Sequence, residues 1–310
     1  MPNKIKIKKA LISVFDKKNI LDISKFLIKN NIEIFSSGGT YKFLKENNIK
    51  VNEISKYTNS PEILDGRVKT LHPKIHGGIL AKRNINKHLK EIKKNKINLF
   101  DLVIVNLYPF KKTILNKSSF NNCIENIDIG GPTLIRASAK NFEFVTTLTN
   151  PNDYQELINE MQKNKNYVSK KTRLNLASKA FSEIASYDID ISNWFSKVEN
   201  NKNQNFLIHS NIVKKLRYGE NPKQKAAIYK NNSILNNKNS FFNTKIIQGK
   251  ELSYNNINDM QAGCLLADEI NMPCVVIIKH ANPCGVSKNN NLLEAYKNAF
   301  KCDPISAFGG

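Results

Sequence analysis

Short apolar runs alternate with amphipathic segments along the first two hundred residues of the chain. Runs typical of buried strands occupy residues 10–15, 32–36, 51–55, 101–108 and 142–148. Segments with apolar residues at helical spacing lie at 19–30, 41–48, 119–127 and 168–194. Thr40 is the expected N-cap of the second helix. Alternating strands and helices predict an α/β domain, in which helices flank a parallel sheet and ligands bind beyond the carboxyl ends of the strands.

The pattern changes after residue 198. Residues 199–212 are polar and rich in asparagine, which predicts a linker, and a polar loop is expected at 231–240. Beyond the linker, the pattern predicts a helix at 259–270 and a strand at 274–280, so the strand–helix order continues. We therefore expect a first domain at 1–198, a linker at 199–212 and a partial second domain at 213–310.

The composition narrows the classes of function. A chain of 310 residues with 40% hydrophobic residues can form two cores. The formal charge of +22 comes from lysines spread over the whole chain without an arginine cluster, so nucleic acid is not an expected partner. Five cysteines without a CxxC pair, and no histidine cluster at zinc spacing, predict reduced thiols in the cytoplasm and no metal site. The apolar runs are too short to span a membrane, so no membrane partner is expected.

Two glycine-containing segments carry the candidate chemistry. Gly66–Gly78 holds the cations of Arg67 and Lys69 and the hydroxyl of Thr70. Glycine lets the backbone approach a ligand closely, and fixed cations suit a phosphorylated substrate. Taken alone, this segment could also be a basic surface loop. Phe35–Thr40 follows a predicted strand and precedes a predicted helix, which is the usual arrangement for holding a phosphate at a helix N-terminus.

These segments belong to a series of motifs that occur in one order along the chain. The motifs are SVFDKKNI, SSGGT, DGRVKTLHPKIHGGIL, VNLYPF, DIGGPTLIRASAKN, LRYGENPKQ, KHANPCGV and DPISAFGG. The series resembles the bifunctional AICAR transformylase/IMP cyclohydrolase family from about Lys9 to the last residue. It covers that family's whole cyclohydrolase domain but only the first part of its transformylase domain. The chain is therefore expected to be a piece of a longer protein or a protein whose second activity has decayed.

The resemblance implies a methylglyoxal-synthase-like parallel sheet flanked by helices, followed by the first part of a cytidine-deaminase-like α/β transformylase domain. It also implies a homodimer in the cytoplasm. The implied reaction of the first domain closes FAICAR, a formamido-imidazole-carboxamide ribonucleotide, to IMP with loss of water. No cofactor and no metal are implied for this step.

The resemblance also assigns roles to residues of the first domain. The implied catalytic residues are Arg67, Lys69, Tyr108, Asp128 and Lys140, with Asp128 and Lys140 on either side of the DIGGPT turn. Substrate contacts are implied for Ser13, Lys17, Ser37, Gly38, Gly39, Thr40, Thr70, Asn106 and Gly130. Two alternatives stay open: Asp128 and Lys140 could form an ordinary surface ion pair, and Tyr108 could serve only packing.

For the second domain, the resemblance implies formyl transfer from 10-formyltetrahydrofolate to AICAR. His280 is the implied base beside Lys279, and Arg217 and Tyr218 are implied to hold the nucleotide. In this chain the second activity is doubtful, because further contacts of the family come from sequence beyond residue 310. 

The chain departs from the family pattern at three positions. Phe15 and Lys18 stand where small hydroxyl residues are usual, and Lys223 stands where histidine is usual. Phe15 removes one possible hydroxyl donor to a phosphate.

Two other functions are compatible with the first domain. A methylglyoxal-synthase-like lyase would act on a small phosphate ester, and a non-catalytic protein would bind a purine nucleotide without turnover. The first alternative leaves Tyr108, Asp128 and the second region unexplained.

Overall fold

The computed structural model describes residues 2–64, 66–198, 207–231 and 247–307. The chain divides into two compact units, Met1–Leu207 and Ile208–Gly310. Helix α10 (Lys170–Val198) precedes this division and strand β8 (Ser210–Lys215) follows it. The division thus falls inside the predicted linker, of which residues 199–206 lie outside the described residues. That linker was predicted to extend too far, because residues 210–212 belong to β8.

Five parallel strands form the sheet of the first unit, in the order β4-β3-β2-β5-β6. They are β2 (Lys9–Val14), β3 (Glu33–Ser36), β4 (Asn52–Glu53), β5 (Leu102–Asn106) and β6 (Thr146–Leu148). The chain adds strands outward from β2 to β4 and then continues on the other side of β2 with β5. The loops that follow β2 and β5 therefore diverge and leave a crevice at the carboxyl ends of these strands. The predicted parallel α/β sheet is confirmed.

Alternate side chains of each strand enter opposite cores. Ala10 and Ile12 of β2 pack in one core with helices α1, α2 and α9, whereas Leu11 packs in the other with α4, α8 and α10. These helices are α1 (Ile20–Lys29), α2 (Gly38–Glu46), α4 (Pro73–Leu80), α8 (Gly130–Lys140) and α9 (Tyr154–Lys163). Both faces of the sheet are covered, which explains the near-continuous apolar sequence of β5.

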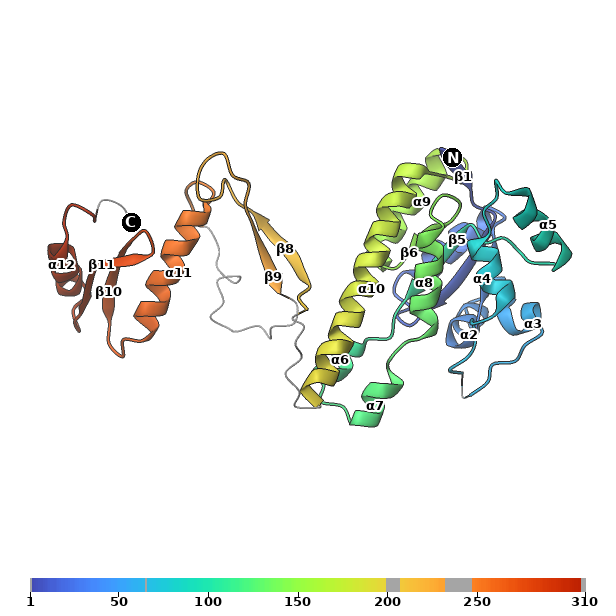
Figure 1. The fold of residues 1–310 in the computed structure, drawn as a ribbon, viewed down its shortest axis with the longest axis horizontal. Coiled ribbons are helices and arrows are strands. Elements are labelled where there is room, and N and C mark those ends of the chain that lie inside the picture. Colours follow the sequence, from blue (N-terminus) through green and yellow to red (C-terminus); the bar gives the residue numbers. More distant parts are fainter. Residues whose placement is uncertain (1, 65, 199–206, 232–246, 308–310) are drawn as a thin grey trace. The chain divides into compact units, whose positions relative to one another are not determined.

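Short helices connect these layers. They are α3 (Ile54–Thr58), α5 (Asn86–Lys94), α6 (Phe110–Leu115), α7 (Phe120–Glu125) and the 3-10 helix η1 (Pro151–Asp153). Helices α6 and α7 lie near one end of the long helix α10, and α8 runs beside its middle (Figure 1). The α7–α8 connection contacts the second half of α10, through Tyr187.

The N-terminus is fixed to the sheet domain by an antiparallel pair, β1 (Lys4–Lys6) with β7 (Tyr167–Ser169). The fully buried Arg173 of α10 reinforces this connection. Its Nε donates to the Phe142 carbonyl at 2.9 Å, and its Nη2 donates to the Pro2 carbonyl at 3.0 Å. One guanidinium thus donates to backbone carbonyls of three segments, at residues 2, 142–143 and 168.

The bounds predicted for several elements of the first unit differ from those of the structure, for example at β4, β6 and α10. The strand expected at 51–55 shortens to β4, because Ile54 already begins α3. The strand expected at 142–148 shortens to β6, since the preceding residues form turns after α8. The long helix begins at Lys170 instead of Val168, because Val168 pairs with Ile5 of β1.

The second unit consists of two antiparallel strand pairs and two helices. Strand β8 pairs with β9 (Ala227–Asn231), and β10 (Cys274–Lys279) pairs with β11 (Asn282–Lys288). Helices α11 (Tyr254–Asp268) and α12 (Leu292–Cys302) pack on the β10–β11 hairpin. Gly285 permits the close approach of α12, since a Cβ there would lie 2.1 Å from the Ala299 carbonyl oxygen.

The second unit differs from what the sequence predicted. Strand β10 was expected to continue in strand–helix order, but the chain reverses at once into β11. The NPCG residues of the KHANPCGV motif lie within β11, and His280 and Ala281 form the turn before it, with φ of 52° and 59°. Helix α11 starts five residues before the predicted 259, because Ser253 and Asn256 form a capping box. The loop expected at 231–240 falls, after Asn231, outside the described residues.

Within the described ranges, no helix combines the length and the apolar character needed to cross a membrane.

Candidate active site

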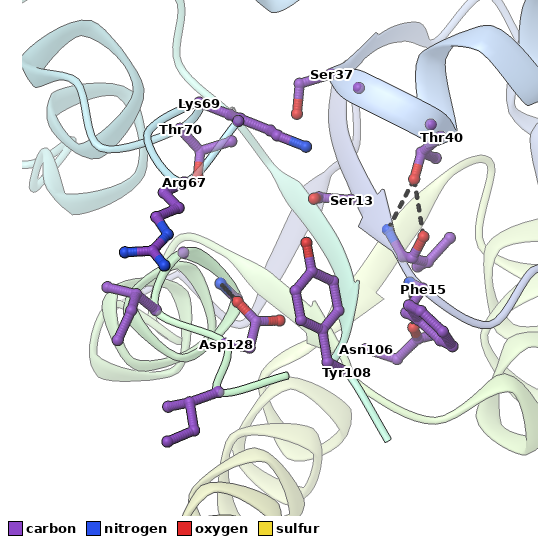
Figure 2. A pocket seen from close by; sticks show the side chains of 18 of the residues that line it. Ser13, Phe15, Ser37, Thr40, Arg67, Lys69, Thr70, Asn106, Tyr108 and Asp128 are labelled. Carbon is purple, nitrogen blue, oxygen red and sulfur yellow. Dashed lines mark hydrogen bonds between the residues drawn. The ribbon is translucent and has the colours of Figure 1, made fainter. Parts of the chain in front are cut away.

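A cavity of about 680 Å³ opens at the carboxyl ends of β2, β3 and β5. It lies where the strand order reverses, which is where α/β sheets bind ligands. Thirteen residues predicted as catalytic or substrate-binding line it: Ser13, Lys17, Ser37, Gly38, Gly39, Thr40, Arg67, Lys69, Thr70, Asn106, Tyr108, Asp128 and Gly130. Figure 2 shows that the side chains of Lys69, Tyr108 and Asp128 reach this cavity from three different segments.

One wall of the cavity is the start of α2. Ser37 is extended, and Gly38 has a φ of +52°, a left-handed conformation that glycine adopts at little cost. The first backbone N–H groups of α2 therefore point into the cavity, where an anion is favoured. Thr40 is wrong as the predicted N-cap, because α2 begins before it. Its Oγ1 instead donates to the Val14 carbonyl at 2.9 Å and accepts from the Val14 N–H at 3.1 Å, which joins α2 to β2 (Figure 2).

The carboxylate of Glu62 reaches this wall from the segment before α4. Glu62 Oε1 accepts from the Gly38 N–H at 2.9 Å, and its Oε2 lies 3.8 Å from Lys69 Nζ. The Glu62 carboxylate therefore occupies the Gly38 N–H at the start of α2 and lies beside Lys69. The sequence analysis missed Glu62, although an acidic residue so close to the GRVKT motif was a usable signal.

Asn106 at the end of β5 binds the loop that follows β2. Its Oδ1 accepts from the N–H groups of Phe15 at 2.6 Å and Asp16 at 2.9 Å, and its Nδ2 donates to the Asp16 carbonyl at 2.9 Å. The Asn106 amide is thus engaged with backbone, although it was predicted to contact substrate. The loop that it holds carries Lys17, whose pKa is lowered by burial. Lys17 Nζ donates to the carbonyls of Val14 and Phe15.

Tyr108 and Asp128 line the cavity and lie near each other. Burial raises the pKa of Tyr108, and the nearby carboxylates of Asp128 and Glu62 raise it further. The phenol therefore keeps its proton and can donate a hydrogen bond. The ring of Phe15 packs edge-on against Tyr108, with 5.5 Å between centroids. The departure from the family pattern at Phe15 thus supplies packing to Tyr108 in place of a hydroxyl.

Asp128 lies just before α8, and its Oδ1 accepts from the Gly131 N–H at 2.8 Å. Burial raises the pKa of Asp128, although the N–H groups of Gly131 and Tyr108 and the charge of Lys69 act in the opposite direction. A carboxylate with a raised pKa is a stronger base than an exposed one. Gly131 must lack a side chain here, because a Cβ would lie 2.5 Å from Asp128 Oδ2.

Two further residues of the predicted set meet at the α8 end of the cavity. Thr70 is buried, and its Oγ1 would lie 3.1 Å from a Cβ on Gly130, so these two motifs are in close contact. Arg67 pairs with Glu125 at the end of α7. Glu125 lines the cavity and was also not predicted as a site residue.

The predicted pairing of Asp128 with Lys140 is wrong within this chain. The DIGGPT segment is the start of α8 and not a turn, and Lys140 is the last residue of that helix. Ten residues of helix separate the two ends by about 15 Å. Lys140 is exposed and lies outside the cavity lining, whereas Lys69 supplies the ammonium near Asp128. The catalytic role of Lys140 stays a prediction.

The predicted residues of the second unit gather around the first turns of α11. Arg217 stacks on the Tyr218 ring at 4.7 Å and donates to its hydroxyl at 2.8 Å. The Tyr218 carbonyl accepts from the Tyr254 N–H at the start of α11. His280 is exposed in the hairpin turn, where the Ala281 N–H donates to Asp259 Oδ1 at 2.7 Å.

Lys279 precedes this turn at the end of β10, and its Nζ donates to Ser306 at 3.5 Å. The Lys223 backbone N–H donates to Asn221 Oδ1, so this departure from the family pattern lies in a local turn. Across the described residues of both units, no group of three or more His, Cys, Asp or Glu side chains is placed to bind a metal ion.

Comparison with known proteins decides the family. The AICARFT/IMPCHase bienzyme family matches residues 138–310, and the MGS-like domain family matches residues 19–133. The chain belongs to the AICARFT/IMPCHase bienzyme family. The family resemblance seen in the motifs is thereby confirmed, as is the MGS-like character of the first unit.

The proteins that are similar to this chain include several named Bifunctional purine biosynthesis protein PurH. That of Prochlorococcus marinus is 49% identical over 97% of this chain, that of Clostridium perfringens 48% over 98%, and that of Rhodospirillum rubrum 47% over 100%. The chain spans 59% to 60% of the length of these relatives. A crystal structure of ForH is similar to 61% of this chain and 99% of its own, with a TM-score of 0.54 and 32% identity.

Proposed function

We propose that the first unit is an IMP cyclohydrolase, which closes FAICAR to IMP with loss of water. One observation carries this proposal: Asp128, with a raised pKa, shares a cavity with the protonated Tyr108, the ammonium of Lys69 and the anion-binding start of α2. A base, a hydrogen-bond donor, a cation and a phosphate site are the groups that this ring closure needs.

The reaction places both reacting groups in one molecule, so holding the right conformer is a large part of catalysis. The carboxamide nitrogen attacks the formyl carbon and forms a new N–C bond, while Asp128 accepts the amide proton. Lys69, Tyr108 or both stabilise the formyl oxygen as it becomes negative. The proton passes to this oxygen and gives a hydroxyl group on the new ring carbon. The nitrogen of the former formamido group then loses its own proton, and the hydroxyl group takes up a proton and leaves as water. The C–O bond breaks in this step, and the new C=N bond completes the aromatic ring.

The phosphate of the nucleotide is expected at the start of α2, with Ser37, Gly38, Gly39 and Thr40, near Ser13 and Lys17. Arg67, Thr70 and Gly130 lie at the opposite end of the cavity and are expected to contact the base or the ribose. The proposal also includes catalytic roles for Arg67 and Lys140. Lys140 does not line the cavity of its own chain.

The test is the formation of IMP from FAICAR by the 310-residue chain, followed by chromatography. Lys69→Ala and Asp128→Asn are each expected to lower kcat about 10²–10³-fold, the usual effect of removing a positioned acid–base or electrostatic group. Lys56→Ala removes an exposed lysine of α3 and is the control. Near-normal turnover in either cavity variant would contradict the site. Methylglyoxal formed from dihydroxyacetone phosphate, with no IMP from FAICAR, would favour a lyase.

For a protein of the relatives' full length, we propose the second activity as well: formyl transfer from 10-formyltetrahydrofolate to AICAR in a cytoplasmic homodimer. The family match over residues 138–310 supports it, and His280, Lys279, Arg217 and Tyr218 are the proposed residues. From this 310-residue chain we expect no formyl transfer, because Arg217 and His280 are exposed. Tetrahydrofolate release that depends on His280 would overturn this expectation.

A further inference from the structure

The segment that carries Asp128 is an irregular connection between α7, which ends at Glu125, and α8, which begins at Gly130. Such a connection lacks a strand ladder or helical bonds to fix its position. The carboxylate of Asp128 is held by the N–H groups of Gly131 and Tyr108. The backbone of the segment needs a second support, because a carboxylate can act as a base only when it is held at a fixed distance from the reacting amide.

Tyr187 of α10 supplies this support. Its hydroxyl accepts from the Asp128 N–H at 2.8 Å and donates to the Asn126 carbonyl at 3.1 Å. The two contacts are 59 and 61 residues away in sequence. One phenol thus binds the donor and the acceptor of neighbouring peptide units and fixes the backbone on both sides of Ile127.

The Tyr187 side chain is itself fixed. It is 9% exposed and belongs to a small core with Phe110 and Cys123, and its ring lies edge-on to that of Phe110, with 6.1 Å between centroids. Burial raises the pKa of Tyr187 to about 12. The hydroxyl therefore keeps its proton over the pH range in which the protein works and always donates to Asn126.

We propose that Tyr187 is a positioning residue for ring closure: its hydroxyl fixes the 126–128 backbone so that the Asp128 carboxylate faces the reacting carboxamide. This inference rests on the proposed cyclohydrolase function. Tyr187 lies outside the lining of the main cavity and acts only through Asp128. The residues expected to bind the phosphate lie on β2, β3 and α2, and the Tyr187 hydroxyl makes its two hydrogen bonds elsewhere.

The test uses the separation between the Tyr187 hydroxyl and the residues that are expected to bind the phosphate. In the full 310-residue chain, Tyr187→Phe keeps the ring and removes the oxygen. We expect kcat for IMP formation to fall about 10²-fold, the effect of a misplacement of about 1 Å. KM for FAICAR and Kd for IMP are expected to stay within about threefold, because phosphate binding is unchanged.

Tyr154→Phe is the matched control. Tyr154 of α9 is 2% exposed, and its hydroxyl is buried without a hydrogen-bond partner. This variant loses the same atom from the same kind of buried site, so kcat and KM should both stay as in the unmodified chain. A fall in kcat of equal size in both variants would mean a general loss of packing and would overturn the positioning role.

Amide hydrogen exchange gives a second readout that does not require catalysis. In the unmodified chain, the Asp128 N–H should exchange slowly although it lies in an irregular segment, and in Tyr187→Phe it should exchange faster. If Tyr187→Phe fails to fold, the unmodified chain still decides: fast exchange at Asp128 would overturn the proposal. If the unmodified chain forms no IMP, the proposed function fails. If it forms IMP and Tyr187→Phe does so equally well, only the role of Tyr187 fails.

Discussion

At the scale of single residues, burial of Asp128 in the cavity makes its carboxylate a stronger base and lowers the stability of the folded chain. Burial raises the pKa of Asp128 above its ordinary value of 3.8, so the ionised form is disfavoured in the folded chain. The folded state therefore binds the proton more tightly than the unfolded state does. Stability falls as the pH rises from about 3.8 to the pKa of the folded state, and the penalty remains at neutral pH. A reactive carboxylate is thus a cost to the fold at working pH.

Asp128→Asn should therefore raise the midpoint of thermal unfolding at pH 7 while it removes activity. Asparagine keeps an oxygen for the Gly131 N–H and loses the charge. Each kcal/mol regained corresponds to about 2–4 °C in a chain of this size. The difference should vanish near pH 3, where Asp128 is protonated in both states. Asp22→Asn, in the exposed first turn of α1, should not raise the midpoint, because an acid there is favoured by the helix dipole. A lower midpoint for Asp128→Asn at pH 7 would contradict this account.

A second prediction concerns Asn106, whose amide holds the loop with Lys17. Asn106→Ala removes three hydrogen bonds to this loop and should weaken IMP binding about fivefold to tenfold, which corresponds to about 1 kcal/mol or slightly more. Titration calorimetry measures the effect. The control is Asn47→Ala, which loses an exposed bond to the Phe43 carbonyl at the end of α2. Equal affinities of the two variants would mean that Asn106 does not organise the phosphate site.

At the scale of elements, the start of α2 depends on the difference between two neighbouring glycines. Gly38 has a φ of +52°, and a Cβ there would lie 3.1 Å from Lys69 Nζ, whereas a Cβ at Gly39 would meet nothing within 4 Å. Gly38→Ala should destabilise the chain by about 1–2 kcal/mol, the cost of a left-handed alanine. Gly39→Ala should stabilise it by up to about 1 kcal/mol, because alanine favours a helix. Urea unfolding of the two variants tests this, and shifts of the same sign would contradict it.

Where the spacing of apolar residues was clear, the sequence predicted correctly whether an element is a helix or a strand. It did not predict the residues at which the elements begin and end. Leu102 to Val105 form a buried run that could only be a central strand. The start of α10 could not be predicted, because Val168 fits either a helix or a strand and its partner Ile5 is far away in sequence. The same holds for the DIGGPT segment, where two glycines and a proline indicate a turn but begin helix α8. Tertiary contacts decide such cases.

At the scale of the whole molecule, the two units differ in how much core they have. The first unit contains three clusters of buried apolar side chains around its sheet. Among the described residues of the second unit, only Ala295 and Ala299 are buried apolar residues. The large side chains of Leu265, Leu293 and Ile305 are exposed there. The first unit has the features of an independent folding unit, and the second does not.

We therefore expect residues 1–207 to unfold in one cooperative transition and to bind IMP when expressed alone. Residues 208–310 alone should show no cooperative transition and should bind a hydrophobic dye such as ANS more strongly. Calorimetry and dye fluorescence of the two fragments check this. A sharp transition in residues 208–310, or a loss of IMP binding in residues 1–207, would show that the division between the units is misplaced.

The candidate site was predictable as a set of residues and not as an arrangement. The motifs predicted thirteen residues that the fold brings to one cavity, because parallel strands place their carboxyl ends at one edge of the sheet. Lys140 was placed beside Asp128 by its closeness in sequence, and an intervening helix separates them. Tyr187 and Glu62 were missed, since their contacts with Asp128 and Gly38 depend on the tertiary fold.

At the proposed phosphate site, the contact between Glu62 and Gly38 would make nucleotide binding an exchange of anions. A phosphate that takes the Gly38 N–H must displace a carboxylate that is tethered to the same chain, and a short tether acts like a competitor at about millimolar concentration. Part of the favourable free energy of phosphate binding at this helix would therefore be offset by the free energy needed to move Glu62 away from Gly38 and Lys69. When the product departs, the same carboxylate returns to the vacated donor. Under the proposed function, the chain would carry its own displacing ion, which would limit how tightly a nucleotide is retained and would favour turnover.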